Sequence, residues 1–233
     1  MSNRDVCVVA GVGPGNGLSL VERFADEGYD VVALARDARR VREMFMDVAA
    51  TAISCDVTDA SQVEETFSEI RERHGPVDTL IYNAGSGKFA TFDDVEADDL
   101  EQSWRVNTLG LFQCAKQVVP DMLDNGGGTI GVTGATASTR GKPFTTAFAQ
   151  AKGAQRLLAQ SLAREFGPQG IHVFLYIVDG VIDTPRTRQM MSDKPDDFFL
   201  DPDDIAQAVW TTAQQPKSAW TFELDLRPYG EEW

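Results

Sequence analysis

Short apolar runs alternate with longer amphipathic segments along nearly the whole chain, and this alternation limits the possible folds more than any other feature. Most of the apolar runs are apolar at successive positions, as is typical of strands that are covered on both faces of a parallel sheet. They lie at residues 6–10, 30–35, 51–54, 79–82, 129–133, 171–178 and 221–226. Segments with helical spacing lie between them, at 18–28, 38–48, 60–74, 98–124, 144–167 and 203–214.

This order of elements predicts an α/β fold. Alternating strands and helices form right-handed βαβ units, which assemble into a doubly wound parallel sheet. We expect about seven strands in a single sheet with helices on both faces. A chain of 233 residues with 42% hydrophobic content is expected to form one domain, residues 1–233.

A glycine-rich turn directly follows the first apolar run. It reads Gly11-Val12-Gly13-Pro14-Gly15-Asn16-Gly17, and a segment with helical spacing begins at Leu18. Glycine permits positive φ angles and has no Cβ atom, so backbone N–H groups at the start of a helix can approach a phosphate. At the end of the first strand of such a chain, the turn predicts a nucleotide-binding site.

The glycine spacing, Gly11-x-x-x-Gly15-x-Gly17, resembles that of the short-chain dehydrogenase/reductase family. Further motifs that are similar to those of the family follow in the family's order and extend the resemblance over about residues 6–228. They are Asp56-Val57 after the third apolar run, Asn83-Ala84-Gly85 after the fourth, Asn107 and Lys152 in helical segments, Asp179-Gly180-x-x-x-Thr184 after the sixth, and the ending 223–228. Two positions depart from the family pattern, since Tyr82 precedes Asn83 and Asp179 replaces a proline.

The resemblance implies a Rossmann fold that binds NAD(P) and acts as an oxidoreductase. It implies catalytic roles for Lys152 and Asn107. The predicted cofactor-binding residues are Gly11, Gly13, Gly15, Asn16, Gly17, Leu18, Arg36, Asp56, Val57, Asn83, Ala84, Gly85, Lys152 and Thr184.

The end of the second strand favours NADP(H) over NAD(H). Members that prefer NAD carry an acidic residue there, which holds the ribose 2′-hydroxyl. This chain has Ala35 followed by Arg36, with Arg39 and Arg40 nearby. A carboxylate would repel a 2′-phosphate, whereas a guanidinium can bind it. An arginine at the start of a solvated helix is the alternative interpretation.

The catalytic motif departs from the family at two positions. The family uses a tyrosine, a lysine four residues later and a serine about a dozen residues earlier. Here Phe148 precedes Lys152, and Ala135 occupies the serine position. A locally shifted loop would bring Ser138 or Thr136 into that position. Other acids near strand ends are Tyr82, Tyr176 and Asp179.

Three functions are compatible with these substitutions. In the first, the protein transfers a hydride to a carbonyl, and another residue or water acts as the acid. In the second, it reduces a substrate that needs no strong acid, such as an enone or an iminium. The third possibility is a catalytically inactive NADP(H)-binding sensor or partner-binding protein. We favour the oxidoreductase with a non-standard proton donor, because hydride transfer is the chemistry of the cofactor and positioning can remain.

Two further regions carry predictions. Residues 185–202 are where the family places its substrate lid. The apolar residues of this segment form either a substrate wall or a helix face that packs on the sheet: Met190, Met191, Phe198, Phe199 and Leu200. The helical segment 98–124 contains Trp104, Leu109, Phe112 and Val119, which are core residues or an oligomer face, and the resemblance implies a homodimer or homotetramer.

Charge and residue counts exclude several other classes. The net charge of −15 disfavours binding to nucleic acid or to an anionic membrane, and no run of about eighteen apolar residues predicts a membrane span. Three widely spaced cysteines and two histidines predict no disulfide framework and no metal site. We therefore expect a cytoplasmic protein that acts on a small-molecule substrate.

Overall fold

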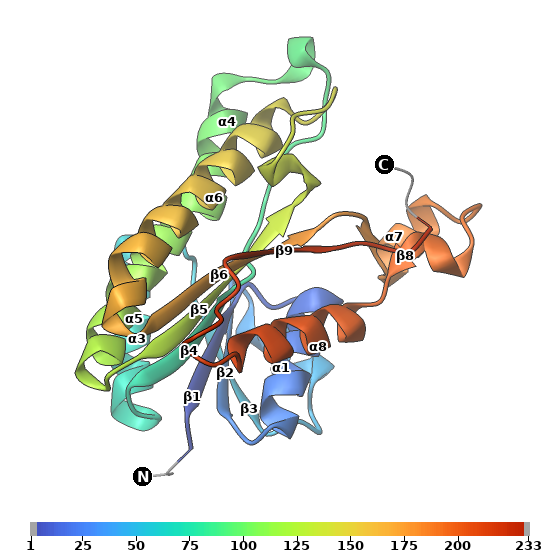
Figure 1. Cartoon of the computed structure of the whole chain (residues 1–233). Helices are drawn as coiled ribbons and strands as arrows, with labels where there is room; N and C mark the ends of the chain where they lie inside the picture. Colours follow the sequence, from blue (N-terminus) through green and yellow to red (C-terminus); the bar gives the residue numbers. More distant parts are fainter. Residues whose placement is uncertain (1–3, 231–233) are drawn as a thin grey trace.

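The computed structural model describes residues 4–230, which contain a parallel sheet of seven strands in the order β3-β2-β1-β4-β5-β6-β9 (Figure 1). All neighbouring strands in it are parallel. The predicted fold class is therefore confirmed. The strands are β1 (Val6–Ala10), β2 (Asp30–Ala35), β3 (Ala50–Ser54), β4 (Val77–Tyr82), β5 (Gly128–Ala135), β6 (Ile171–Val178) and β9 (Glu223–Leu226).

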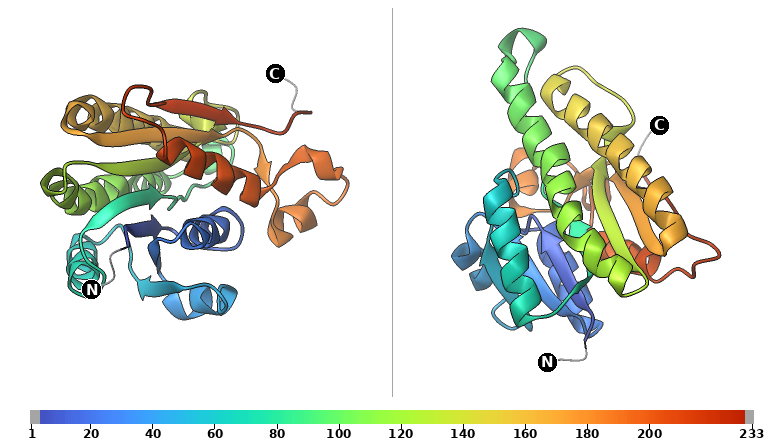
Figure 2. Two further views of the ribbon diagram at one scale, coloured as in Figure 1. Left: turned by 60° about the horizontal axis from the view of Figure 1, so that its bottom comes forward. Right: turned by 90° about the vertical axis from the view of Figure 1, so that its left-hand side faces the viewer.

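Helices cover both faces of the sheet, and each face has its own hydrophobic core (Figure 2). One core packs against α3 (Ala60–Arg73), α5 (Gly110–Asp124) and α6 (Thr146–Phe166). The other packs against α1 (Asn16–Asp26), α2 (Ala38–Met44) and α8 (Pro202–Ala213). Because both faces are covered, every residue of β1 and of β6 is buried.

The order of the strands reverses at β1, which lies between β2 and β4. In a doubly wound sheet, the crevice at the carboxyl ends of the strands on either side of this reversal is where ligands bind. The glycine-rich turn follows β1 and Asn83 follows β4, so the two motifs meet at this position. The backbone N–H of Asn83 donates a hydrogen bond to the Ala10 carbonyl, at 2.8 Å.

The helix expected at 98–124 is present and contains one irregular turn. It consists of α4 (Ala97–Trp104), a π-helical turn (Arg105–Leu109) and α5. Gly110 begins α5 directly against β4, because a Cβ atom there would lie only 2.2 Å from Tyr82 Oη. The helical segment therefore runs without a break from 97 to 124, close to the expected bounds, and its irregular turn contains Asn107.

The segment 185–202 has structure that the sequence patterns did not predict. It contains a short helix, α7 (Pro185–Met190), and strand β8 (Phe199–Leu200), which pairs with β7 (Val181–Ile182) in a separate two-stranded sheet. Phe199 and Leu200 are buried, whereas 68% of Met190 is exposed. The apolar residues of this segment therefore do not share one face.

Residues 4–230 contain no helix that is both long enough and apolar enough to cross a membrane. Over the same range, histidine, cysteine and acidic side chains form no cluster that could hold a metal ion.

Candidate active site

The glycine turn is packed closely against two other parts of the chain. Gly11 and Gly15 have φ angles of +95° and +89°, which glycine adopts readily and other residues rarely adopt. A Cβ atom on Gly11 would lie 2.3 Å from the backbone nitrogen of Ala84, and one on Gly15 would lie 2.6 Å from Thr184 Cγ2. A Cβ on Gly13 would meet nothing within 4 Å. The structure thus brings three of the predicted motifs together.

The N-terminus of α1 lies within this turn. No side chain caps it, and its first turn contains no acidic residue. Its positive dipole end and its amide groups are therefore available to an anion. The Leu18 amide is the exception, because it donates to the carbonyls of Gly13 and Gly15.

Asn16 lies at this helix start, but its side chain points into the protein. It is 5% exposed, and its Nδ2 donates to Asn83 Oδ1 at 2.7 Å. Asn83 Nδ2 in turn donates to the Gly11 carbonyl at 2.8 Å, and Thr133 Oγ1 donates to Asn83 Oδ1 at 2.9 Å. The two asparagine side chains therefore tie the glycine turn to β4 and β5.

Two further predicted cofactor positions follow β2 and β3. Arg36 is exposed at the end of β2 and forms no ion pair within residues 4–230. Asp56 is half-buried, and its Oδ1 accepts hydrogen bonds from the backbone and hydroxyl groups of Thr58 at 2.9 and 2.8 Å. Val57 is buried in the core beside Gly110. Arg36 is the cation at the position where a 2′-phosphate is expected.

Lys152 is buried below the carboxyl edge of the sheet, with 3% of its surface exposed. Its Nζ donates to the Thr133 carbonyl at 2.8 Å and to Gln155 Oε1 at 2.9 Å. Burial lowers the pKa of Lys152 to about 7, because the low-dielectric surroundings disfavour the ammonium form. At neutral pH this lysine can therefore both give and take a proton.

The ring of Phe148 lies beside Lys152, with its centroid 5.8 Å from Nζ. It packs tightly on the loop after β4, since a Cβ atom on Gly87 would lie 2.5 Å from Phe148 Cδ2, and it contacts the ring of Phe89 at 5.2 Å. The ring offers no hydroxyl group.

Asn107 is fully buried in the π-helical turn. Its Nδ2 donates to the carbonyls of Ser86 and Ser103, at 2.6 and 2.7 Å. Its Oδ1 is buried without a hydrogen-bond partner in residues 4–230. A Cβ atom on Gly85 would lie 3.4 Å from this oxygen and 3.8 Å from Lys152 Nζ, so the two predicted catalytic residues face the same exposed glycine.

Sequence reasoning missed Gln155. This side chain is fully buried, and its Nε2 donates to the Asn107 carbonyl at 2.8 Å while its Oε1 accepts from Lys152. The available signal was a glutamine in register with the buried residues Ala151, Ala159 and Leu162 of α6. A buried amide at such a position requires hydrogen-bond partners for both of its ends.

The hydroxyl groups near Ala135 form hydrogen bonds within the protein. Ser138 is 6% exposed, and its Oγ accepts a hydrogen bond from the Ala135 amide at 3.0 Å within a short 3₁₀ turn. Thr136 Oγ1 donates to Asp179 Oδ1 at 2.5 Å. The Thr136 proton is therefore committed to Asp179, whereas Ser138 accepts from the Ala135 amide and its own O–H has no hydrogen-bond acceptor within residues 4–230.

The other candidate acids are also poorly suited to donate a proton. Tyr82 is fully buried and donates to the Val106 carbonyl, and Tyr176 is fully buried against Thr133 Oγ1. Burial raises the pKa of both tyrosines. Their hydroxyl groups therefore face protein partners rather than a substrate.

Asp179 is 3% exposed and forms ion pairs with Arg140 and Arg227, at 3.1 and 3.5 Å. Burial alone would raise its pKa, but the hydrogen bond from Thr136 and the charges of the two arginines outweigh this effect and lower it. Asp179 is consequently a carboxylate at neutral pH and not an acid.

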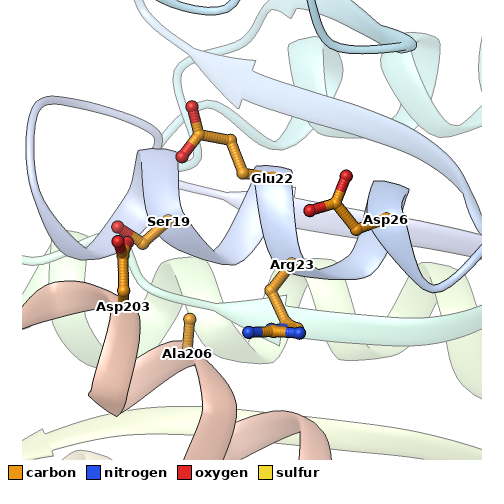
Figure 3. A pocket seen from close by; sticks show the side chains of 6 residues that line it. All are labelled: Ser19, Glu22, Arg23, Asp26, Asp203 and Ala206. Atoms are coloured by element: carbon orange, nitrogen blue, oxygen red, sulfur yellow. The ribbon is translucent and has the colours of Figure 1, made fainter.

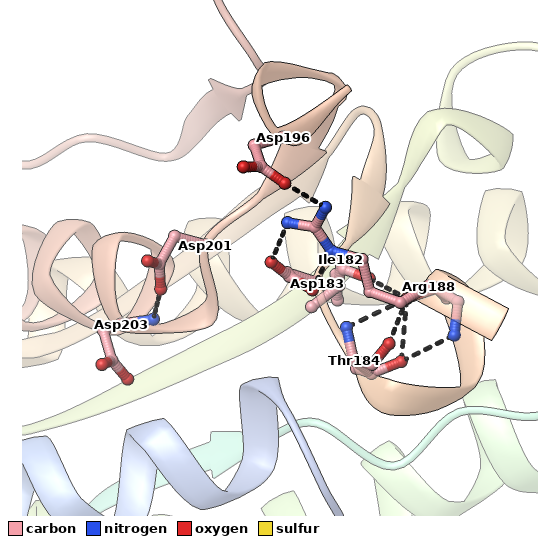
Figure 4. Close-up of polar contacts among 8 residues, drawn as sticks. Ile182, Asp183, Thr184, Arg188, Asp196, Asp201 and Asp203 are labelled. Atoms are coloured by element: carbon pink, nitrogen blue, oxygen red, sulfur yellow. Dashed lines mark hydrogen bonds and ion pairs between the residues drawn. The ribbon is translucent and has the colours of Figure 1, made fainter. Parts of the chain in front are cut away.

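The segment after Thr184 is held by polar contacts (Figure 4). Arg188 donates from Nε to Asp183 at 2.7 Å and also pairs with Asp196. Thr184 caps α7 by accepting from the Thr187 amide at 3.1 Å. These contacts order the expected lid segment beside Gly15.

A polar hollow of about 130 Å³ lies elsewhere, between α1 and α8 (Figure 3). It is lined by Ser19, Glu22, Arg23, Asp26, Asp203 and Ala206. Its three carboxylates would repel a phosphate. This hollow is therefore not a second nucleotide site.

Comparisons with known proteins identify similar chains over almost the full length. A family model described as short chain dehydrogenase matches residues 5–195. Carbonyl reductase family member 4 of Xenopus tropicalis is 28% identical over 217 residues, which cover 91% of this chain and 92% of that protein. An uncharacterized oxidoreductase of Staphylococcus saprophyticus is 29% identical over 230 residues, which cover 96% and 97%.

Solved structures show the same similarity. A short-chain dehydrogenase from Rhodopseudomonas palustris has a TM-score of 0.84 and 31% identity, covering 98% of this chain and 100% of that one. An alcohol dehydrogenase from the archaeon Thermococcus sibiricus, complexed with 5-hydroxy-NADP, has a TM-score of 0.87 and 26% identity, covering 99% of each chain.

Proposed function

The chain belongs to the short-chain dehydrogenase/reductase family, and we propose that it is an NADP(H)-dependent oxidoreductase with a non-standard proton donor. Its substrate is a small molecule with a carbonyl group or an activated double bond. The observation that carries the proposal is the meeting of the glycine turn, Asn107 and Lys152 at one edge of the sheet, while Phe148 and Ala135 lack the usual hydroxyl groups.

The residues at this edge fit a dinucleotide. The glycine turn leaves no room for Cβ atoms at Gly11 and Gly15, while the position of Gly13 is open, and the uncapped start of α1 suits a pyrophosphate. In this proposal the turn holds the pyrophosphate, residues 56–57 contact the adenine, and residues 83–85 together with Lys152 and Thr184 hold the nicotinamide half.

The preference for NADP(H) rests on Arg36. This side chain is exposed and without an ion pair in residues 4–230, in a chain of net charge −15. A guanidinium in that place binds a phosphate bidentately, and no acidic residue stands at the end of β2 to hold a free ribose hydroxyl. The Thermococcus sibiricus relative with 5-hydroxy-NADP supports the same choice.

When bound, a reduced nicotinamide supplies the hydride. The protein supplies position and the exclusion of water, through the tight packing of Phe148 on the loop after β4. It must also supply a proton to the oxygen that becomes an alcohol, or to the carbon of a reduced double bond. Loss of a positioned acid costs on the order of 10²–10⁴ in rate, so slow turnover is expected.

The test is NADPH oxidation, followed by absorbance, with ketones, quinones, enones and cyclic imines as acceptors. The wild type is compared with the Phe148→Tyr, Ala135→Ser double variant. Turnover by the wild type supports the proposal, and the preferred acceptor class identifies the substrate. The matched control is Phe92→Tyr, which adds a hydroxyl group to a ring that is 78% exposed and should leave the rate unchanged.

A catalytically inactive NADP(H)-binding protein is the second candidate. It is favoured by one observation, that the hydroxyl groups of Thr136, Tyr82 and Tyr176 are bonded to other groups of the protein. This protein would bind NADPH without hydride transfer to any acceptor, and the double variant would gain activity from zero. That pair of results would replace the first proposal.

Two further proposals concern the lid and assembly. We propose that residues 185–202 form a substrate lid, because Thr184, which caps α7, lies beside the glycine turn. We also propose a homodimer or homotetramer, because Trp104 and Phe112 are 40% and 46% exposed, whereas Val119 belongs to the core. Sedimentation of the wild type and of a Trp104→Glu, Phe112→Glu variant tests the assembly.

A further inference from the structure

A single buried amide connects the two predicted catalytic residues. Gln155 has no exposed surface, and both ends of its side chain are bonded: Nε2 donates to the Asn107 carbonyl at 2.8 Å, and Oε1 accepts from Lys152 Nζ at 2.9 Å. Burying an amide is costly unless its hydrogen bonds are made, so this side chain has little freedom to move.

The hydrogen bond between Gln155 and the Asn107 carbonyl depends on the π-helical turn. Intrahelical bonding normally occupies the carbonyls of a helix, but the turn at 105–109 widens the helix, and the Asn107 carbonyl accepts from Gln155. The other end of the amide faces Lys152, which lies three residues earlier on the same helix and therefore on the same side of it.

Lys152 is left with one donor that the protein does not use. An ammonium has three N–H groups, and the carbonyl of Thr133 and the amide of Gln155 take two of them. The third has no hydrogen-bond partner within residues 4–230. Exposed Gly85 and the ring of Phe148 are the groups that border Nζ on the side of the site.

We propose that Gln155 is a positioning residue, which holds the Lys152 ammonium so that Lys152 itself delivers the proton that Phe148 cannot supply. The inference rests on the proposed oxidoreductase function and names its acid. A carbonyl carbon that accepts the hydride leaves an electron pair on the oxygen. That oxygen takes a proton from Lys152 Nζ, and the neutral amine takes one back from water.

The ionisable groups on the surrounding elements are not placed to deliver the proton instead of Lys152. On β4 and β6, the hydroxyl groups of Tyr82 and Tyr176 are bonded to Val106 and Thr133. At the end of β6, Asp179 is paired with Arg140 and Arg227, and on α4 the pair Glu101–Arg105 is exposed. Burial is the cause of the low pKa of Lys152, without a contribution from another charge.

The first experiment measures Lys152 itself, without cofactor. The chain contains six lysines, so ¹³C NMR of the lysine ε-carbons can follow each during a pH titration, with Lys152→Met assigning the resonance. Gln155→Leu removes an acceptor of the ammonium and should lower the pKa of Lys152 by about one unit or more. Gln155→Glu places a carboxylate against it and should raise this pKa.

The matched control is Gln160→Leu, which changes a partly exposed glutamine one turn further along α6 and should leave the Lys152 titration in place. If the Lys152 pKa is the same in the wild type, Gln155→Leu and Gln155→Glu, the proposal is wrong. Gln155→Glu is the second variant if Gln155→Leu does not fold, because the carboxylate has the size of the amide and still accepts from Lys152 Nζ, although it cannot donate to the Asn107 carbonyl.

The second experiment is the pH profile of kcat for NADPH oxidation. If Lys152 delivers the proton, the rate falls as pH rises through the pKa of Lys152, and this limb moves to lower pH in Gln155→Leu and to higher pH in Gln155→Glu. If the enzyme turns over but the pH profile of kcat is the same in the wild type and in both variants, Lys152 does not deliver the proton. The proposed oxidoreductase function is not affected by that result. A shifted NMR titration without turnover at any pH refutes both the proton delivery and the proposed function.

Discussion

Lys152 is expected to make the folded protein less stable at neutral pH. The structure lowers its pKa from the ordinary value of 10.5 to about 7 through burial. Each pH unit of such a displacement is worth about 1.4 kcal/mol, so the full cost to the folded state is about 5 kcal/mol. A protein retains a residue with this cost at a functional site more readily than in an ordinary core position.

The sign of the effect follows from proton binding. Between pH 7 and about 10.5 the unfolded chain holds a proton on Lys152 that the folded chain has released, so stability rises with pH over this window. Below pH 7 both states hold the proton and the whole cost is present. At pH 9.5 roughly a third of it remains.

The perturbation is Lys152→Met, and the assay is urea unfolding at pH 7 and pH 9.5. The stability of the variant relative to the wild type should fall by about 3 kcal/mol between pH 7 and pH 9.5, because the wild type gains that amount and methionine does not titrate. Lys116→Met, at an exposed lysine of α5, is the control and should show no such change. A difference that stays constant between the two pH values would refute the reasoning.

Three other predictions can be tested on the same protein. Gly15→Ala places a Cβ 2.6 Å from Thr184 at a φ of +89°, so it should weaken NADPH binding at least about tenfold in a fluorescence titration, whereas Gly13→Ala, which meets nothing within 4 Å, should change it little. Arg36→Asp should reverse the ratio of the dissociation constants for NADPH and NADH, and an unchanged ratio would show that another group binds the 2′-phosphate. Asp179→Asn should cost about 2 kcal/mol of unfolding free energy at pH 7, because it removes the buried carboxylate that pairs with Arg140 and Arg227. Since the pKa of Asp179 is lowered, that stabilisation is present above about pH 4 and is lost as the pH falls below it, so an Asp179→Asn penalty that persists at pH 2 would contradict the assignment.

The strands were predicted best where the chain is apolar on both faces. The expected bounds of β1, β2 and β6 agree with the structure, because their side chains are buried on both sides of the sheet and the apolar run is the whole strand. The π-helical turn between α4 and α5 could not be predicted in the same way. It adjoins the close approach of Gly110 to Tyr82, two residues that are far apart in the sequence.

In the candidate site, too, features of a short segment could be predicted from the sequence, whereas contacts between distant residues could not. The glycine turn could be recognised from the sequence because φ angles and missing Cβ atoms are properties of single residues in a short segment. Asn16 was expected to contact a cofactor, yet its side chain is bonded to Asn83, a residue 67 positions away. Asp179 was considered as an acid, yet arginines from two other segments keep it ionised.

The sequence by itself determined the doubly wound sheet and the place of the glycine turn, because these follow from local periodicity and residue type. That Phe148 and Ala135 stand in place of catalytic hydroxyl groups is a prediction from the family resemblance. Only the tertiary structure decided the state of Lys152 and the part played by Gln155. Burial sets the pKa of the lysine, and the amide has a partner only because α6 packs against the π-helical turn of another segment. Those effects arise from desolvation and from contacts across the fold, which no local pattern encodes.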